Sequence, residues 1–548
     1  MGGIKYKVGW VYSGVSSMMK PLPQANLDVL IEKIRAIGVT TCCMGAGSRS
    51  SQLVHALNQV GINMIPFFDE RVIGYLALGL IKAKNQPVVA LTTSGTAVSN
   101  LCPAMTEAAN SHLPLIALTA DRPKHMQGTS ANQTIKQSGV FQDALAEVHW
   151  ENKNQQSSLD EAIQAMHSFG GPIHINVHLE DPVNEALVQI ESKPVVSIKN
   201  KPTLHKMSSN LMTLLEHTHH GLLCIGQLEP WVSLASIKAV IDHFDWPVVL
   251  DGSNASLKGH PNVVHSVDAF CEMVGGDTFD QVVVLGGRWI SKKMGAFLSK
   301  NNVVHISEGA KPVVQLKQSF KVSYAELLKP IIKSHAMSIS SINKRYQDAF
   351  QDVLKQHPSS DLAFINSALN NIKAPFDCFI SNSLPARFFD NMQVKLLRNV
   401  FMNRGASGID GNIATIIGLC MEPSEIPLLA IIGDLAALYD LNAFLMLKKC
   451  QRPVTIIIIN NGGGDIFSLL PSATSTTKFD EQFKCAHDWD LTKMLKGMDC
   501  NAVRLSDPSH LTIEFNQNVI ECMSSGGADA FQMIQKKYKE FNHDERQY

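Results

Sequence analysis

The sequence predicts an α/β protein of three domains, each built around a mainly parallel sheet flanked by helices. The chain has 548 residues, which at roughly 150 residues per domain is enough for three or four hydrophobic cores. Short apolar segments alternate with segments of helical periodicity along most of the chain, which is the order of βαβ units. Glycine-rich or polar turns follow several apolar segments, as expected where parallel strands deliver side chains to one edge of a sheet.

The first third alternates helix and strand signals. Residues 26–37 have helical periodicity and end at Gly38, a residue typical of a helix C-terminus. Further helices are expected at 71–82 and 97–110. Strands are expected at 39–44, 63–68, 87–92, 114–119 and 172–177.

The rest of the chain repeats this order. The middle third predicts a Lys-rich helix at 329–355 and strands at 222–225, 247–251, 281–285 and 302–306. The last third predicts strands at 378–381, 399–402, 427–432, 454–460, 502–505 and 528–534. We therefore expect an N-terminal extension at 1–22 and three domains at 23–185, 205–335 and 358–548.

Composition excludes several classes of protein. Hydrophobic residues make up 45% and charged residues 18%, which is typical of a compact enzyme. The 48 basic and 49 acidic residues nearly cancel, so no overall field attracts nucleic acid or an anionic membrane. The eleven cysteines lack zinc spacing, and no apolar run approaches the ~18–20 residues of a membrane span. We expect a cytoplasmic protein with reduced thiols, no membrane span and small-molecule partners.

The most informative segment runs from Gly433 to Asn461. One apolar strand ends in Gly433-Asp434 and a second ends in Asn460-Asn461, and Asn461 lies 27 positions after Asp434. Two oxygen ligands beside glycine-rich backbone suit a diphosphate that carries Mg²⁺ or Mn²⁺. The spacing is typical of the thiamin diphosphate (ThDP) motif, with a carbonyl near Gly463 as a third metal ligand. Taken singly, Gly-Asp is often a helix N-cap and Asn-Asn-Gly often a turn.

Glu70 is the expected activating carboxylate. It follows a predicted strand in the segment Phe68-Asp69-Glu70-Arg71. ThDP needs a carboxylate that hydrogen-bonds the pyrimidine N1′, and burial in apolar surroundings would keep the pKa of that carboxylate high. An ordinary surface residue at a helix start is the alternative, and the ThDP motif favours the catalytic interpretation.

An internal repeat supports the domain division. Pro87 begins an apolar strand, a helical segment follows, and Pro114 begins the next strand 27 positions later. Pro427 and Pro453 frame the same order across 26 positions. The two segments predict one supersecondary unit that occurs twice, although βαβ units also resemble one another by chance.

Arginines recur at the ends of predicted strands. Each one alone is typical of a structural salt bridge, but several together indicate substrates with more than one carboxylate, because guanidinium binds carboxylate bidentately. An apolar segment after the metal motif either shields the reacting carbon from water or packs in the core. The polar residues at strand ends are Ser48, Arg49, Arg122, Gln133, Ser383, Arg387 and Arg404, and the apolar residues after the metal motif are Ile466, Phe467 and Leu470.

Together these segments resemble the 2-succinyl-5-enolpyruvyl-6-hydroxy-3-cyclohexene-1-carboxylate (SEPHCHC) synthase family of menaquinone biosynthesis, also called MenD. The most specific markers are NRGASGIDG at 403–411 and ADRP at 120–123. The resemblance implies a ThDP-dependent transferase that decarboxylates 2-oxoglutarate and adds the succinyl carbanion equivalent 1,4 to isochorismate. It also implies a homodimer or homotetramer with ThDP between the first domain of one subunit and the third domain of its partner.

The resemblance implies a role for each site residue. Ser383, Arg387 and Arg404 would face the part derived from 2-oxoglutarate. Ser48, Arg49, Arg122, Gln133 and Lys292 would face isochorismate. The cofactor would contact Glu70, Ile409, Gly433, Asp434, Leu435, Asn461, Gly463, Ile466 and Phe467, and Leu470 would complete an apolar wall beside the substrates.

The sequence departs from the family pattern at a few positions. Ala46, Ser51 and Gln52 stand where we expect proline, threonine and proline, and Lys293 stands where we expect arginine. Two alternatives stay open. Another ThDP carboligase, such as an acetohydroxyacid synthase, would need an FAD site, and the middle third lacks the G-x-G-x-x-G fingerprint. A non-catalytic ThDP-fold subunit is disfavoured by the presence of Glu70 together with both predicted metal ligands.

Overall fold

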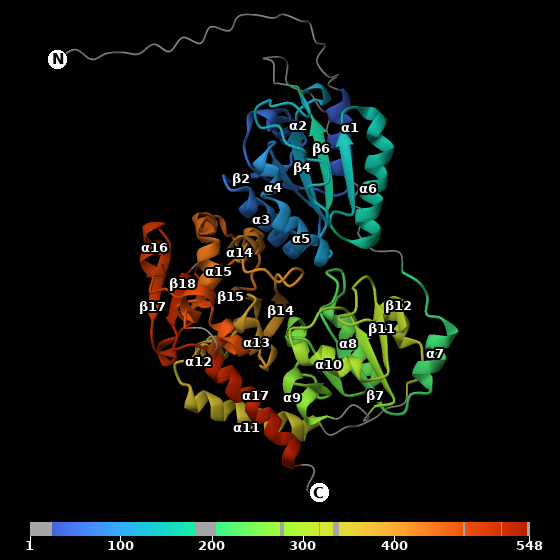
Figure 1. The fold of residues 1–548 in the computed structure, drawn as a ribbon. Helices are drawn as coiled ribbons and strands as arrows, with labels where there is room; N and C mark the ends of the chain where they lie inside the picture. Colours follow the sequence, from blue (N-terminus) through green and yellow to red (C-terminus); the bar gives the residue numbers. More distant parts are fainter. Residues whose placement is uncertain are drawn as a thin grey trace, which may run out of the picture.

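The computed structural model describes residues 25–180, 204–274, 279–316, 318–332, 339–474, 477–516 and 518–544. Within them the chain forms three six-stranded sheets flanked by helices (Figure 1). All pairings between neighbouring strands are parallel. The predicted three-domain α/β architecture is confirmed. The expected extension at 1–22 lies outside the described residues.

The first unit (25–180) contains the sheet β2-β1-β3-β4-β6-β5. The predicted strands and helices are present with small shifts at their ends, but the edge strand β5 was not predicted, and the expected helix at 97–110 is split into α4 and α5. The strands are β1 (Thr41–Met44), β2 (Asn63–Pro66), β3 (Val88–Thr92), β4 (Leu115–Asp121), β5 (Ala146–Trp150) and β6 (Ile173–His178). The helices are α1 (Ala25–Ala36), α2 (Ser51–Gln59), α3 (Glu70–Lys84), α4 (Thr96–Ser99), α5 (Cys102–Asn110) and α6 (Gln156–Phe169).

The third unit (339–544) contains the sheet β14-β13-β15-β16-β18-β17, which repeats the strand order of the first sheet position by position. The repeat expected at Pro87 and Pro427 is confirmed, since β3–β4 and β15–β16 occupy equivalent places. The strands are β13 (Phe376–Ile380), β14 (Leu397–Phe401), β15 (Leu428–Gly433), β16 (Val454–Asn460), β17 (Asn501–Leu505) and β18 (Asn518–Met523). The helices are α11 (Ile339–Gln356), α12 (Asp361–Asn370), α13 (Leu384–Asp390), α14 (Asn412–Met421), α15 (Asp434–Tyr439), α16 (Leu491–Gly497) and α17 (Ala528–Asp544).

The central unit (204–332) has a different strand order, β12-β11-β10-β7-β8-β9, so it is not a third copy. The Lys-rich helix expected at 329–355 begins too early: residues 329–332 are not helical, residues 333–338 lie outside the described residues, and helix α11 runs over Ile339–Gln356. The strands are β7 (Gly221–Ile225), β8 (Val248–Leu250), β9 (Val263–Val264), β10 (Gln281–Leu285), β11 (Val303–Ser307) and β12 (Gln318–Lys321). The helices are α7 (Ser209–Glu216), α8 (Leu234–Phe244), α9 (Val267–Met273) and α10 (Lys292–Ser299).

One predicted strand is wrong. Residues 528–534 are the start of helix α17, and the sixth strand of the third sheet is β18, ten residues earlier along the chain. Helix α17 begins where it does because the amides of Gly527 and Ala528 both donate to Asp465 Oδ2, at 2.8 Å each. A carboxylate that accepts the free amides at a helix start stabilises the helix.

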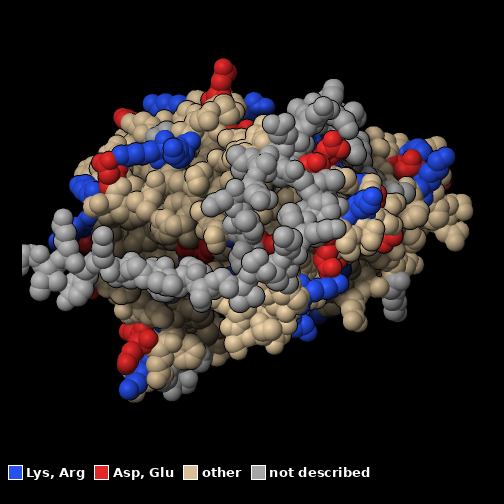
Figure 2. All heavy atoms as spheres, turned by 90° about the horizontal axis from the view of Figure 1, so that it is seen from above, with Lys and Arg blue, Asp and Glu red and all other residues tan. Residues whose placement is uncertain are grey.

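The first and third units share one hydrophobic core, in which α3 packs along α14 (Figure 1). The two backbones touch: a Cβ on Gly79 would lie 2.2 Å from the carbonyl oxygen of Thr415, and one on Gly418 would lie 2.2 Å from that of Leu76. Only glycine allows this approach. On the visible part of the face in Figure 2, basic and acidic side chains are interspersed, which agrees with the balanced charge of the sequence.

Candidate active site

The predicted site residues follow the carboxyl ends of strands in the first and third sheets. In the third sheet, Ser383 follows β13, Arg404 follows β14, Asp434 follows β15 and Asn461 follows β16. Gly433 pairs with Ile459 across β15 and β16, so Asp434 and Asn461 leave adjacent strands at the same edge. Side chains that leave parallel strands at one edge are available to one ligand.

The predicted metal site has a buried oxygen that none of the described residues uses. Asp434 is 2% exposed, and its Oδ1 accepts from Leu435 N at 2.7 Å while its Oδ2 accepts from Gly463 N at 2.9 Å. Asn461 Nδ2 donates to Asp361 Oδ2 at 2.9 Å, and Asn461 Oδ1 is buried with no hydrogen-bond partner among the described residues. An unpartnered amide oxygen beside a buried carboxylate fits a hard cation such as Mg²⁺.

The glycines after β16 shape the backbone around this oxygen. Gly462 and Gly463 have φ of 76° and 140°, and a Cβ on Gly463 would lie 2.5 Å from Lys484 O. A side chain at this position would therefore displace the turn. Among the described residues no group of three His, Cys, Asp or Glu side chains forms a complete metal cage. Phosphate oxygens would have to complete the coordination shell of Mg²⁺ here, as they do in nucleotide and diphosphate sites.

Sequence reasoning missed two groups beside the metal ligands. Burial raises the pKa of Asp361 to about 7, and this carboxylate orients the Asn461 amide. His487 Nε2 lies 3.3 Å from Asp434 Oδ2. Burial is also the main cause that raises the pKa of Asp434. No motif or spacing joins Asp361 or His487 to the GD…NN pattern, so only the fold could reveal them.

Glu70 lies at the carboxyl edge of the first sheet, as expected, but it is not enclosed by apolar side chains. It is the first residue of α3, after Asp69, whose Oδ1 caps the helix by accepting from Arg71 N at 2.9 Å. Glu70 is half-buried, and its Oε2 accepts from Asn100 Nδ2 at 3.4 Å. The expectation of apolar burial is wrong for the single chain. Glu70 lines a shallow open hollow instead, beside Phe68, which is 66% exposed.

Within the described part of the chain, neither Arg387 nor Arg404 forms an ion pair with a carboxylate. Arg387 Nη1 donates to Ser383 O at 2.9 Å, and Arg404 donates to Asn382 Oδ1 at 3.1 Å and to Trp289 O at 3.3 Å. Burial and then the charge of Arg404 lower the pKa of Arg387. The charge of Asp268 opposes this lowering of the Arg387 pKa, but the hydrogen bonds of both guanidinium groups in the described part of the chain go to neutral oxygens. Two neighbouring cations held in this way favour an anionic ligand. Ser383 has φ of 76°, a strained conformation of the kind found at functional sites.

Four of the five residues predicted to bind isochorismate lie in the first unit. Arg49 and Arg122 are buried at the edge of the first sheet; Arg49 donates to Leu179 O at 2.9 Å and Arg122 to the Ser94 hydroxyl. Ser48 is exposed beside Arg49. Gln133 is exposed and lies near Gly95, in the same unit.

Lys292 is exposed at the start of α10, in the central unit. Its neighbour Lys293, the position whose role the sequence left open, forms an ion pair with Glu272. Lys292 is therefore the more available of the two cations.

The apolar residues after the metal motif are not simply core. Phe467 is 39% exposed and Leu470 is 40% exposed, while Ile466 and Ile409 are half-buried. The alternative of plain core packing is therefore wrong for Phe467 and Leu470. Their exposure leaves them free to contact a ligand or a second chain.

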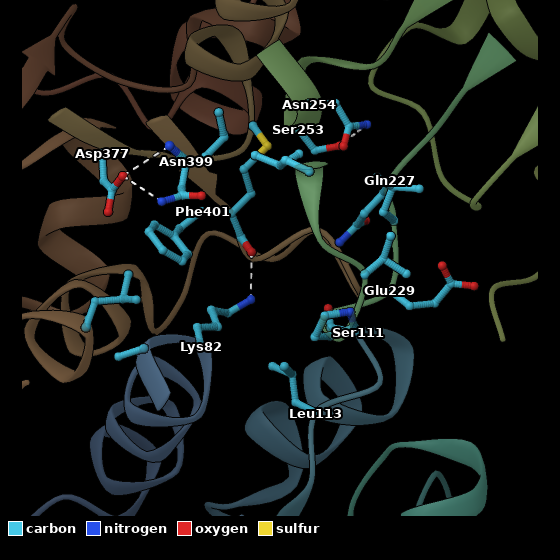
Figure 3. Close-up of a pocket in the computed structure, with 18 of the residues that line it drawn as sticks. Lys82, Ser111, Leu113, Gln227, Glu229, Ser253, Asn254, Asp377, Asn399 and Phe401 are labelled. Atoms are coloured by element: carbon cyan, nitrogen blue, oxygen red, sulfur yellow. Dashed lines mark hydrogen bonds between the residues drawn. The ribbon is translucent and has the colours of Figure 1, made fainter. Parts of the chain in front are cut away.

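A separate cavity of about 520 Å³ lies where the three units meet (Figure 3). Lys82, Ser111, Gln227, Glu229 and Asn399 are among the residues that line it. None of the predicted site residues does so, and the chemistry described above is therefore located at the sheet edges rather than in this cavity.

Comparisons with known proteins agree with this geometry. Residues 26–144 match the thiamine pyrophosphate enzyme N-terminal TPP binding domain, and residues 385–528 match the corresponding C-terminal TPP binding domain. The chain is 30% identical over 502 residues to the SEPHCHC synthase of Shewanella frigidimarina, which covers 83% of this chain and 86% of the relative. The synthase of Shewanella amazonensis is also 30% identical, over 493 residues, 83% of this chain and 85% of the relative.

The chain belongs to the SEPHCHC synthase family. The two matched TPP-binding domains coincide with the first and third units, which carry the two groups of predicted cofactor residues. In this family member, the described helices include none long and apolar enough to cross a membrane.

Proposed function

We propose that this chain is a SEPHCHC synthase: a ThDP-dependent carboligase that decarboxylates 2-oxoglutarate and adds the succinyl carbanion equivalent to isochorismate, in menaquinone biosynthesis. The observation that supports it best is the pair Arg387 and Arg404, which lie at the same sheet edge as the metal motif and form no ion pair with a carboxylate among the described residues. A decarboxylase for a small monocarboxylate has no need of two such cations.

One group of residues would hold the metal ion and the cofactor. Asp434, Asn461 and the backbone near Gly463 would hold Mg²⁺ or Mn²⁺ and, with Gly433 and Leu435, the diphosphate. When bound, ThDP supplies a nucleophilic carbon and an electron sink for decarboxylation of a 2-oxo acid. Glu70 would keep a proton at the pyrimidine N1′ through its carboxylate.

The other side chains would position the two substrates. Arg387 and Arg404, with Ser383, would bind the carboxylates of 2-oxoglutarate. Arg49, Arg122 and Lys292, with Ser48 and Gln133, would bind those of isochorismate. The apolar group would exclude water from the reacting carbon and support the cofactor; it consists of Ile409, Ile466, Phe467 and Leu470.

We also infer that the active enzyme is a homodimer or a homotetramer with shared sites. Glu70 accepts a hydrogen bond from Asn100 and lies beside Gly45, both in the first unit, and exposed apolar side chains occur in the segments that carry the predicted cofactor residues or follow them in the chain. Exposed patches of this kind mark contacts between proteins. These exposed side chains are Phe68, Tyr439, Leu445, Phe467 and Leu470. We further propose a cytoplasmic location and domain boundaries at 23–185, 205–335 and 358–548, after an extension at 1–22.

An assay with defined substrates tests the function. The purified chain with ThDP, Mg²⁺, 2-oxoglutarate and isochorismate should release CO₂ and form a product with the mass of SEPHCHC. Release of CO₂ without the adduct would instead identify a simple decarboxylase. Formation of an acetohydroxy acid from pyruvate would identify the acetohydroxyacid synthase alternative.

Arg404→Ala should chiefly weaken the use of 2-oxoglutarate. Loss of charge-assisted hydrogen bonds to a substrate carboxylate should raise its KM by about 10- to 100-fold. Steady-state kinetics with each substrate varied in turn measure this effect. Arg398→Ala, an exposed arginine on the preceding strand β14, is the matched control and should change neither KM. A rise confined to the KM of isochorismate would show that Arg404 has been assigned to the wrong substrate.

A further inference from the structure

The loop that carries Arg404 is attached to the first unit as well as to its own, where Asn382 Nδ2 donates to Asn403 O and Gly408 O at 2.7 Å each. This loop spans residues 402–411, between β14 and α14, and it also carries Ile409. Lys82 Nζ donates to Met402 O at 2.9 Å near one end of the loop, and Tyr75 Oη donates to Asp410 Oδ2 at 2.8 Å near the other. Both anchoring side chains come from α3, the helix that begins with Glu70.

A buried carboxylate holds the middle of the loop. Glu107, on α5, is 1% exposed; its Oε1 accepts from Gly405 N at 2.9 Å and its Oε2 accepts from Ala406 N at 2.7 Å. The Ser111 hydroxyl also donates to Oε1, at 2.7 Å. Both carboxylate oxygens are therefore used, and a carboxylate that accepts several backbone amides is a strong and directional anchor.

The backbone of Gly405 packs closely against α5 beside this anchor. A Cβ on Gly405 would lie 2.5 Å from Ser111 Oγ and 2.7 Å from Glu107 O. Arg404 immediately precedes the clamped amides, and its guanidinium donates to Asn382 in the third unit and to Trp289 in the central unit. Arg404 thus lies where all three units meet, and Glu107 fixes its backbone.

We propose that Glu107 is a positioning residue for 2-oxoglutarate, which sets the place of the Arg404 guanidinium by holding the amides of Gly405 and Ala406. This inference rests on the proposed function of Arg404. Both Glu107 oxygens are occupied by the loop amides and by Ser111, so Glu107 acts through the loop and not on the substrate itself. It links the first unit to the loop that carries Arg404.

Glu107→Gln tests the proposal with little change of shape. The amide can accept from one backbone N–H but presents a donor to the other, so one side of the clamp is lost. The KM for 2-oxoglutarate should rise about tenfold, while the KM for isochorismate and the Kd of ThDP change less than about threefold. In an Arg404→Ala background, the same substitution should add less than about a twofold change, because residues that act as one unit are not additive.

Glu422→Gln is the matched control. Glu422 also joins the third unit to α3, through Lys84 at 2.7 Å, but it does not touch the loop. It should leave both KM values unchanged. A merely structural role for Glu107 predicts that the two variants behave alike, or that the effects of Glu107→Gln and Arg404→Ala multiply; either result overturns the proposal.

Hydrogen exchange provides a readout that does not need activity. In the holoenzyme without substrate, peptides that contain Gly405 and Ala406 should exchange faster in Glu107→Gln than in the unmodified chain or in Glu422→Gln. Unchanged exchange would contradict the clamp. If the unmodified chain fails to use 2-oxoglutarate and isochorismate, the proposed function fails instead, and the exchange measurement still decides whether Glu107 holds the loop.

Discussion

Glu70→Gln should reduce turnover by about a thousandfold while ThDP still binds, because a general acid–base contact typically contributes 10²–10⁴-fold to rate. Glutamine keeps the size of the side chain and still offers an oxygen to N1′. It cannot carry the negative charge that stabilises a protonated pyrimidine, so activation of the cofactor should fail.

Two measurements separate activation from binding in this variant. Single-turnover release of CO₂ should fall with turnover, and the Kd of ThDP from calorimetry should change less than about threefold, because the diphosphate is bound elsewhere. Glu161→Gln, an exposed position on α6, is the control and should retain full activity. Near-normal turnover by Glu70→Gln would show that Glu70 does not activate the cofactor.

Asp434→Ala should abolish cofactor binding at ordinary concentrations. Substitution of residues that merely support a metal ligand costs 10- to 100-fold in affinity, so loss of a direct carboxylate ligand should cost about a hundredfold or more. Titration of Mg²⁺ in the presence of ThDP measures this loss. The stabilisation of the folded protein by ThDP and Mg²⁺ should disappear with it, since ligand binding raises the melting temperature by mass action.

The protein without cofactor gives the control for the same substitution. Removal of the carboxylate also leaves the amides of Leu435 and Gly463 without their acceptor, so the melting temperature of the cofactor-free variant is the reference from which the stabilisation by ThDP and Mg²⁺ is measured. Asp499→Ala, which removes an exposed carboxylate, should leave cofactor binding unchanged. Undiminished Mg²⁺ affinity in Asp434→Ala would exclude this residue as the ligand.

Local signals predicted the parts of the fold that depend on neighbours in the chain. The apolar run at 454–460 became β16 without a shift, and the repeat at Pro87 and Pro427 became two sheets of the same strand order. The strand predicted at 528–534 was wrong, because seven residues of an amphipathic helix show too little periodicity to exclude a strand. The contacts that start this helix come from Asp465, far back along the chain.

Only the site residues that belong to a sequence motif could be predicted from the sequence. Asp434 and Asn461 follow adjacent strands, so their spacing was enough to bring them to one edge. Glu107 lies 298 positions from Gly405, and no local pattern marks a carboxylate that serves a distant loop. The burial of Glu70 was also not predictable from the sequence. It depends on packing around the residue, including any contact with a second subunit, and no local pattern encodes that packing.

In the proposed enzyme, two half-sites from different subunits make one ThDP site. Glu70→Gln and Asp434→Ala chains, each inactive alone, should be unfolded together, refolded at equal amounts and assayed. Random pairing makes half of the dimers mixed, and each mixed dimer keeps one intact site of two, so about a quarter of the unmodified activity should return. Mixed dimers that form but remain inactive would show that Glu70 and Asp434 serve the same site within one chain, and would contradict the shared site.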